Sequence, residues 1–343
     1  MEEDMNVRKK AELTLGGGVK LPEGFVFPYR LSKSTAGPGA GSTSAVFSFE
    51  GHRVKKSISY ESGEFELRDD NGRLSMTRNG ESFLGDVKIE PVVFHCPEQA
   101  FFNLDQRCIF NCAFCASPKL DKALNKGYTD EDIVSMTKKA VGEQKVVSVS
   151  LTSGVIGSID DTVRRFVSCT SELRKAFPDL PIGVEPYVSN EDHVRALKDA
   201  GATEIKLNIQ SPNREIFGRI CPELDYDNIL RLLRYATEVF GKGKVTSNMI
   251  FGMGETDEET EEMMELFCSS GIIPTVRALR VNPINRDSLR NAIGEQPRVD
   301  ADRAIKLARI QKDKLEKYGL DTRECRTMCI ECACCDLAPF RDF

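Results

Sequence analysis

The chain has 343 residues, which is enough for one α/β barrel of about 250 residues and a smaller unit. Its composition, with 40% hydrophobic and 29% charged residues, is that of a globular protein, and no apolar run reaches the roughly 18 residues that could span a bilayer. The formal net charge of −6 and the polar, mixed-charge N-terminus argue against a nucleic-acid-binding face and a secretory signal. We therefore expect a cytoplasmic protein with neither a membrane nor a nucleic acid as partner.

Residues 1–91 predict a small β-rich N-terminal unit. Short alternating stretches such as 45–49 are typical of half-buried strands, and Asn71-Gly72 supplies the positive φ values of a tight hairpin turn. The glycine-rich segment 34–44 is expected to be a loop. A phosphate-binding loop is the alternative there, although the lysine and the following helix that such a loop requires are missing.

Residues 92–298 predict an α/β fold, a partial or full (β/α) barrel, because strands alternate with amphipathic helices. Ligands of such folds bind at the carboxyl ends of the strands, so we expect the functional residues there. The expected strands are 92–104, 146–151, 182–187, 204–209, 244–250 and 275–281, and the expected helices are 129–141, 160–176, 190–200, 225–240 and 256–270.

Residues 299–343 predict one long helix over 301–318 and a cysteine-rich C-terminal tail. The chain has 12 cysteines, and without an export signal they are more typical of metal ligands or catalytic groups than of disulfides. Eight of them fall into two tight clusters. The other four are expected to be small core residues: Cys96, Cys169, Cys221 and Cys268.

The first cluster comprises Cys108, Cys112 and Cys115, directly after the first expected strand of the barrel. Three thiolates on one loop can hold three irons of a cubane and leave the fourth iron open for another ligand. A structural zinc site is the alternative, with His95 or Cys96 as fourth ligand, but both precede the end of the strand. The spacing therefore favours an iron-sulfur cluster.

This Cys-x3-Cys-x2-Cys spacing, with Phe114 before the last cysteine, resembles the cluster motif of the radical S-adenosylmethionine (SAM) superfamily. The resemblance implies a barrel of radical SAM type and a 4Fe-4S cluster whose open iron is chelated by SAM. It also implies reductive cleavage of SAM to methionine and a 5′-deoxyadenosyl radical, with a reducing partner such as ferredoxin or flavodoxin. The radical chemistry then belongs to the cofactor, and no side chain is assigned a catalytic role.

The resemblance also implies SAM contacts at the ends of the expected strands. Ser153 and Gly154 stand where the family has a glycine-rich stretch, although the usual Gly-Gly-Glu is replaced here. Glu185 and Asn208 follow the next two strands and could reach ribose hydroxyls. Local hydrogen bonds to backbone are the alternative for both.

Three further SAM contacts are implied by later segments. Arg219 resembles an arginine that pairs with the SAM carboxylate in the biotin synthase branch, and a solvated helix-end arginine is the alternative. Met249 and Gly252 lie in the stretch 247–256, which resembles the strand that contacts adenine. We expect all three beside the cofactor.

The second cluster comprises five cysteines within eleven residues, and such crowding in a reducing compartment predicts a second metal centre. Three of them repeat at ferredoxin-like spacing, and a fourth precedes them, which predicts an auxiliary iron-sulfur cluster. Zinc is the alternative, because spacing alone does not separate tetrahedral zinc from a cubane. The predicted ligands are Cys329, Cys332 and Cys335, with Cys325 as the fourth.

Over residues 92–335 the chain is similar to biotin synthase and lipoyl synthase, in which a second cluster is consumed as a sulfur donor. The stretch 277–285 resembles the biotin synthase strand that ends in Asn-Pro-Ile. The size of the chain also resembles one half of an archaeal two-part lipoyl synthase, which implies a partner radical SAM subunit.

The resulting hypothesis is a radical SAM transferase that inserts sulfur into unactivated C–H bonds of a substrate, which a carrier protein or peptide could present. One alternative is a radical SAM methylase, mutase or lyase whose second cluster is structural or carries electrons. Another is a metal-binding module without catalysis, which leaves the barrel and its SAM-like segments unexplained.

Overall fold

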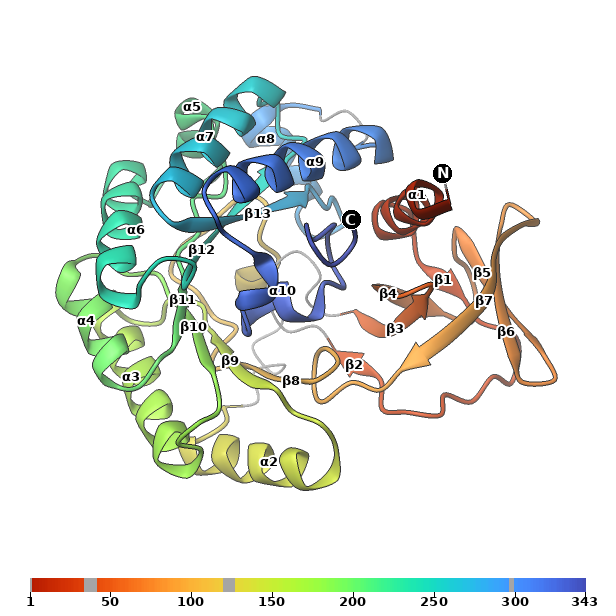
Figure 1. Ribbon diagram of the computed structural model, residues 1–343, viewed down its shortest axis with the longest axis horizontal. Coiled ribbons are helices and arrows are strands. Elements are labelled where there is room, and N and C mark those ends of the chain that lie inside the picture. Colours follow the sequence, from red (N-terminus) through yellow and green to blue (C-terminus); the bar gives the residue numbers. More distant parts are fainter. Residues whose placement is uncertain (1, 34–41, 120–126, 296–298) are drawn as a thin grey trace.

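The computed structural model describes residues 2–33, 42–119, 127–295 and 299–343. Two sheets, each with its own hydrophobic core, lie side by side, and the C-terminal tail lies between them (Figure 1). Most of the glycine-rich segment 34–44, predicted as a loop, lies outside the described residues. The boundaries predicted at residues 91 and 298 stay predictions.

The N-terminal unit consists of one helix and a seven-stranded sheet. Its elements are α1 (Glu2–Leu15), β1 (Val19–Lys20), β2 (Ser32–Lys33), β3 (Thr43–Phe49), β4 (His52–Ser59), β5 (Phe65–Asp70), β6 (Arg73–Arg78) and β7 (Glu81–Glu90). The order is β2-β3-β4-β1-β5-β6-β7, and an additional pairing of β3 with β7 closes six of the strands into a ring. Large side chains such as Phe47, Phe65 and Met76 fill the inside of this ring.

Two features of this unit bear on the sequence predictions. The turn between β5 and β6 is confirmed, with φ of 55° at Asn71 and 90° at Gly72. Helix α1 was not predicted, because its sequence is polar and its apolar pattern is weak. It is stabilised by tertiary contacts instead: Val7 and Ala11 pack against the C-terminal segment, and Leu13 enters the core of the sheet.

The second sheet has six parallel strands in chain order, the open arrangement of a partial barrel. The strands are β8 (Gln99–Asn103), β9 (Ser148–Thr152), β10 (Ile182–Glu185), β11 (Glu204–Lys206), β12 (Val245–Phe251) and β13 (Ile272–Ala278). Each expected strand of the barrel is present, which confirms the predicted fold class. The first is shorter than predicted, because residues 92–98 form a turn instead of extending β8.

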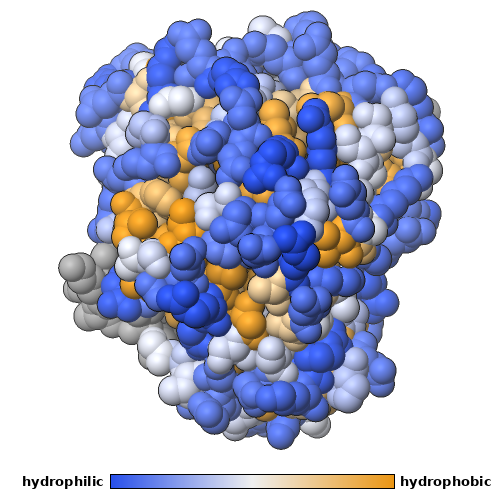
Figure 2. Space-filling model, turned by 90° about the vertical axis from the view of Figure 1, so that its left-hand side faces the viewer, coloured by the Kyte–Doolittle hydropathy of each residue, from blue (hydrophilic) through white to orange (hydrophobic). Residues whose placement is uncertain are grey.

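Helices cover the outer face of this sheet (Figure 1). They are α2 (Asp130–Glu143), α3 (Ile159–Ala176), α4 (Glu191–Asp199), α5 (Arg214–Ile220), α6 (Tyr226–Phe240), α7 (Asp257–Ser269), α8 (Arg286–Ile293) and α9 (Ala301–Lys317). Viewed from the side, this helical face is mostly hydrophilic, with apolar residues showing between the polar ones (Figure 2). Thr129 caps α2 through a capping box with Asp132. Among the described residues no helix is long and apolar enough to cross a membrane.

The tail follows α9 and contains two short elements, the 3-10 turn η4 (Thr322–Glu324) and helix α10 (Met328–Cys332). A further 3-10 turn, η2 (Ser117–Lys119), follows the first cysteine cluster. The tail enters the inner side of the barrel, where the Met328 N–H donates to Ser150 Oγ over 2.8 Å. On the same strand Val149 and Leu151 belong to the hydrophobic core, so the side chains of successive residues of β9 point to opposite faces of the sheet.

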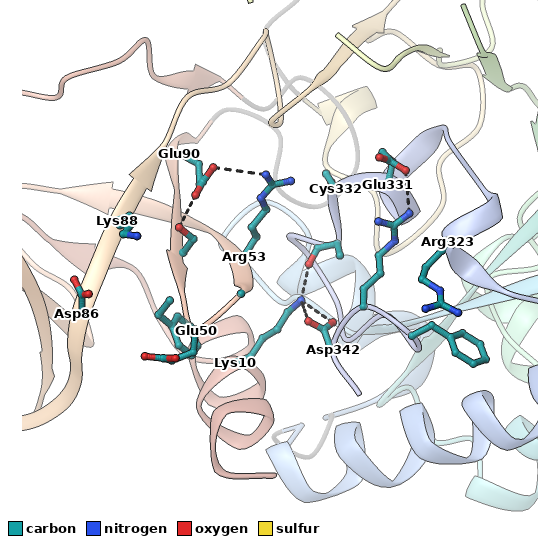
Figure 3. A pocket seen from close by; sticks show the side chains of 16 residues that line it. Lys10, Glu50, Arg53, Asp86, Lys88, Glu90, Arg323, Glu331, Cys332 and Asp342 are labelled. Carbon is teal, nitrogen blue, oxygen red and sulfur yellow. Dashed lines mark hydrogen bonds and ion pairs between the residues drawn. The ribbon is translucent and has the colours of Figure 1, made fainter. Parts of the chain in front are cut away.

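A buried ion pair fixes the end of the tail to the N-terminal unit. Lys10 Nζ lies 2.7 Å from both carboxylate oxygens of Asp342 and donates to the Ala333 carbonyl over 2.7 Å (Figure 3). Asp342 also lies 3.0 Å from His52 Nδ1. The side chain of Lys10 is fully buried and that of Asp342 is 2% exposed, so both charges depend on this pairing.

Replacement of Asp342 by Asn is expected to lower the free energy of unfolding by about 3 kcal/mol, because the Lys10 charge would stay buried without compensation. Burial raises the pKa of the Asp342 carboxyl, but Lys10, His52 and the Ala338 N–H outweigh it, so the pKa lies below its usual value. A carboxyl whose pKa is lower in the folded than in the unfolded protein stabilises the fold at pH values above its unfolded pKa of about 3.9. This stabilisation is lost as the pH falls through the folded pKa. Urea denaturation should therefore give a larger difference between wild type and Asp342→Asn at pH 7 than at a pH of about 3.

The control for this comparison is Asp313→Asn, on the exposed face of α9. It should change the stability little at either pH. Equal destabilisation by Asp342→Asn at both pH values would contradict the assignment of the pH-dependent stability to this carboxyl.

Candidate active site at the carboxyl edge of the barrel

A cavity of about 660 Å³ lies at the carboxyl ends of the barrel strands. Its walls come from three parts of the chain: the first cysteine cluster, the strand ends, and the C-terminal tail. Arg30 and Leu31 of the N-terminal unit also reach it. The cavity is the place where the sequence predicted the functional residues to meet.

The loop that carries the first cysteine cluster follows β8, and backbone hydrogen bonds join its first residues to the end of β9. The Leu104 N–H donates to the Thr152 carbonyl, and the Gly154 N–H donates to the Asp105 carbonyl, both over 2.8 Å. The Val155 N–H donates to Cys108 Sγ over 3.4 Å, which orients this sulfur directly. A backbone amide that points at a thiolate stabilises its negative charge.

The far side of the loop is held by two later segments. The Ala113 N–H donates to the Ile220 carbonyl at the end of α5, and Asn285 Nδ2 donates to the Phe114 carbonyl, both over 2.8 Å. Cys221, expected as an isolated core residue, lies beside Cys112, and its hydrogen bond lowers the pKa of the Cys112 thiol. The loop is thus fixed at both ends before any metal binds.

The three thiols of this loop, on Cys108, Cys112 and Cys115, all line the cavity. Among the described residues no three His, Cys, Asp or Glu side chains converge on a single ion-sized point. A cubane does not require such convergence, because each of its thiolate ligands binds a different iron. Three cysteines on the wall of one cavity therefore fit a 4Fe-4S cluster, which their sulfurs would hold.

Four of the predicted SAM contacts lie in the same cavity: Ser153, Gly154, Glu185 and Asn208. Asn208 Nδ2 donates to Glu185 Oε1 over 2.7 Å, and Lys206 Nζ lies 3.4 Å from the same oxygen. Burial raises the pKa of the Glu185 carboxyl, but Lys206 and Asn208 outweigh it, so the group stays ionised. It can accept hydrogen bonds from hydroxyl groups of a ligand.

The structure does not bring the other three predicted contacts to the cavity. Arg219 is exposed and pairs with Glu215 one turn away on α5. Met249 is fully buried in the core, and the Gly252 N–H donates to Glu255 Oε1 over 2.7 Å. Their roles in SAM binding stay predictions.

The residues of β12 that do line the cavity are Asn248 and Ile250, the neighbours of Met249. Sequence reasoning missed them. The signal was available, because side chains alternate along a strand and the apolar Met249 belongs on the opposite face from the polar Asn248.

The tail contributes Cys329 and Cys335 to the same cavity. Beside them, Arg277 of β13 pairs with Asp336, with 2.9 Å between Nε and Oδ2. Cys332 instead lines a separate charged cleft of about 680 Å³ between the tail and the N-terminal unit (Figure 3). Two of the tail cysteines therefore line the same chamber as the first cysteine cluster, which is remote in sequence.

Cys325 lies apart from the other tail cysteines. Its thiol is buried and donates to Glu204 Oε2 over 3.3 Å. The same carboxylate accepts from Thr327 Oγ1 over 2.6 Å and from the Thr327 N–H over 2.9 Å. Glu204, at the start of β11, is a functional anchor that the sequence did not reveal, since an acidic residue at a strand start is unremarkable. The predicted role of Cys325 as a metal ligand stays a prediction.

Comparison with known proteins agrees with this geometry. Residues 103–267 match the model of the Radical SAM superfamily. The chain is 26% identical over 200 residues to lipoyl synthase of Caldanaerobacter subterraneus subsp. tengcongensis, covering 54% of this chain and 68% of that protein. It is 29% identical over 207 residues to biotin synthase of Geobacter sulfurreducens, covering 59% and 58%.

Solved structures support the fold. The chain is similar to methylornithine synthase, with a TM-score of 0.52, 16% identity and coverage of 62% of each chain. It is also similar to the FeFe-hydrogenase maturase of Carboxydothermus hydrogenoformans, with a TM-score of 0.51, 17% identity and coverage of 64% of this chain and 52% of the other.

Residues 103–267 are therefore assigned to a radical SAM domain, and proteins of this class bind a 4Fe-4S cluster and use SAM. Similar proteins include lipoyl and biotin synthases. The matches span between 58% and 68% of the length of the two relatives named above.

Replacement of Gly154 by Ala tests the packing of the first cysteine loop. A Cβ at this position would lie 2.0 Å from the Arg107 carbonyl oxygen and 3.1 Å from Cys108 Cβ, so the loop must shift. We expect the variant to retain less than about half of the first-site iron after anaerobic reconstitution, because a shift of the loop moves one of three ligands. Iron analysis and visible absorption measure this.

Gly142→Ala on α2 is the matched control, since an added Cβ there meets nothing within 4 Å. It should bind iron like the wild type and be slightly more stable, as alanine favours a helix over glycine. Full iron retention in Gly154→Ala would refute the close contact.

Proposed function

We propose that this protein is a radical SAM enzyme that removes hydrogen from unactivated carbon and inserts sulfur from a second iron-sulfur cluster. The observation that carries the proposal is the shared cavity, which Cys108, Cys112 and Cys115 line together with Cys329 and Cys335. A carbon radical is reactive and short-lived, so the group that traps it has to lie in the chamber where it forms.

At the first site the three loop thiols would hold the 4Fe-4S cluster. With SAM bound and one electron from a reductant, that cluster would supply the 5′-deoxyadenosyl radical chemistry for hydrogen abstraction, with methionine as the second product. The protein's own part is to bind and orient the cofactor. Glu185 and Asn208 can form hydrogen bonds with hydroxyl groups of the cofactor. Gly154 has no side chain, so the backbone at this position can lie close to the Arg107 carbonyl in the cysteine loop.

Aromatic side chains around the same chamber would exclude solvent from it. Phe94 and Phe102 lie 5.0 Å apart between ring centroids, and Phe110 meets Tyr187 edge-on at 5.2 Å. All four line the cavity. Apolar walls slow the quenching of a reactive intermediate by side reactions.

At the second site Cys329 and Cys335 would hold the sulfur-donating cluster on the cavity side. When bound there, the cluster would supply the sulfur for each C–S bond that replaces a C–H bond, and its iron would take up the one electron that this exchange releases. Relatives named lipoyl synthase and biotin synthase support sulfur insertion as the reaction class.

The proposal includes the expected partners. A one-electron donor such as ferredoxin or flavodoxin would reduce the first cluster, and the substrate would arrive on a carrier protein or peptide. The contribution of Arg30 and Leu31 to the cavity supports a role of the N-terminal unit at the substrate entrance. A partner radical SAM subunit would complete a two-part system.

Cys112→Ala is expected to abolish SAM cleavage, with a loss of at least about a hundredfold in 5′-deoxyadenosine formed under dithionite, because two remaining thiolates hold a cubane poorly. Liquid chromatography of the nucleoside measures it. Cys169→Ala, a buried cysteine of the α3 core, is the matched control and should cleave SAM normally. Wild type that forms no 5′-deoxyadenosine with SAM and dithionite would refute the enzyme assignment.

Sulfur transfer is tested with protein reconstituted with ³⁴S-sulfide and incubated with SAM, reductant and a cell extract. We expect ³⁴S in a new organic product and loss of one cluster's sulfide from the protein per turnover. Cys332→Ala should continue to cleave SAM but form no labelled product. An intact second cluster through several turnovers would reject sulfur donation and favour the methylase, mutase or lyase alternatives.

A further inference from the structure

Cys96 lies in a tight turn between the N-terminal unit and the barrel. The Val93 N–H donates to the Cys96 carbonyl over 3.0 Å, and Cys96 forms an isolated bridge with Gln99. The turn is sharp enough to place Glu98 at a φ of 57°. The Cys96 thiol is 2% exposed and reaches Gln99 Oε1 only at 3.6 Å, a weak interaction.

This thiol faces the tail. Cys96, Cys332 and Cys334 pack in one buried cluster together with Val46 and Val92. Two segments separated by more than two hundred residues thus bring the Cys96 and Cys332 side chains into one buried cluster.

The orientations of the remaining tail cysteines narrow the choice of a fourth ligand. Cys334 donates to the Cys332 carbonyl over 3.0 Å, and Cys325 donates to Glu204, whereas the contact of Cys332 Sγ with the Cys329 carbonyl is longer, at 3.5 Å. Cys329, Cys332 and Cys335 keep the x2 spacing of a cluster loop. Among the described residues, Cys96 is the cysteine from outside the tail that packs in the same buried cluster as Cys332.

A buried lysine supplies a separate observation. Lys55 of β4 is 6% exposed and donates to Ser32 Oγ over 2.9 Å and to the His95 carbonyl over 2.7 Å, and its Nζ lies 2.9 Å from His95 Nδ1. In the described part of the chain, no carboxylate forms an ion pair with it. Burial lowers the pKa of the Lys55 ammonium, and negative charge on four nearby cysteines would oppose this effect: Cys96, Cys332, Cys334 and Cys335.

A buried ammonium requires compensating negative charge, and neutral thiols do not provide it. Thiolates that ligate a metal cluster are anionic, and they would surround Lys55. The placement of this cation is therefore explained if the neighbouring sulfurs belong to a metal centre.

We infer that Cys96 is the fourth protein ligand of the second cluster, beside Cys329, Cys332 and Cys335. The inference rests on the proposed second cluster and replaces Cys325 as its fourth ligand. The N-terminal unit then forms part of the metal site. Its strand β4 contributes Lys55, and the backbone N–H of Lys55 donates to the Cys334 carbonyl over 2.9 Å. The charged cleft beside Cys332 marks where this unit meets the tail (Figure 3).

The test uses the full chain with the first cluster removed by Cys108→Ala, Cys112→Ala and Cys115→Ala. After anaerobic reconstitution this parent should hold about four irons and four sulfides per chain, the content of one cubane. Adding Cys96→Ala is expected to lower the iron at least about fourfold, whereas adding Cys325→Ser should leave it unchanged, since a hydroxyl still donates to Glu204. Cys268→Ala, a buried cysteine away from both sites, is the second control.

Rescue separates ligation from packing. Excess 2-mercaptoethanol during reconstitution should restore iron to the Cys96→Ala protein, because a small thiolate can occupy the vacated position; a packing defect would not respond. Should Cys96→Ala fail to fold by circular dichroism, Cys96→Ser takes its place, and a changed EPR spectrum of the reduced cluster is then expected. An unchanged spectrum would overturn the inference.

Other outcomes are equally informative. Iron retained in Cys96→Ala, or lost in Cys325→Ser alone, overturns the assignment of Cys96 and leaves the second cluster standing. A parent protein without iron overturns both the second cluster and this ligand, while SAM cleavage by the unmodified first site remains a separate measurement.

Discussion

The arrangement of the site depends on one buried carboxylate. Glu204 stands at the start of β11 and receives hydrogen bonds from the Arg326 and Thr327 N–H groups and from the Thr327 hydroxyl. Opposite it, a Cβ on Gly183 would lie 2.2 Å from Thr327 Oγ1, so only glycine leaves room for the tail. These contacts draw a distant segment into the barrel. They fix the start of the tail relative to the sheet that also carries the cysteine loop.

With the tail in place, the inner side of the barrel becomes a lined chamber. One wall is formed by the cysteine loop, which backbone hydrogen bonds join to β9. Another wall contains Cys329 and Cys335 beside the Arg277–Asp336 ion pair. Polar side chains of the sheet, such as Asn208 and Asn248, also line this chamber. A parallel sheet whose outer face is covered by helices provides a rigid frame for such a chamber, since its strands are fixed on both sides.

Much of the fold could be predicted from the sequence. Alternating strands and helices defined the barrel because its elements are long and strongly periodic, and capping residues such as Thr129 marked helix starts. Short elements such as α5 and α10 carry too few residues for a period to show. Helix α1 was also missed, because contacts with distant segments stabilise it and its own pattern does not.

The first cysteine cluster was predictable because its three cysteines are close together in the sequence, and all three line the cavity. Contacts that depend on strand register were less accessible: Met249 was chosen where its neighbour Asn248 lines the cavity. Roles created by long-range folding were not visible at all. Cys96 looked like a solitary core residue, and only the tertiary structure places it against Cys332.

The Lys10–Asp342 ion pair joins positions 332 residues apart. During synthesis a ribosome must therefore complete almost all of this polypeptide before that bond can form, and contacts of such high sequence separation assemble slowly. The thiols gathered beside it stay open to oxygen and stray metal ions throughout that interval. Assembly of the proposed second cluster would have to follow the docking of residues 325–342, which makes the order of maturation a property of the fold itself.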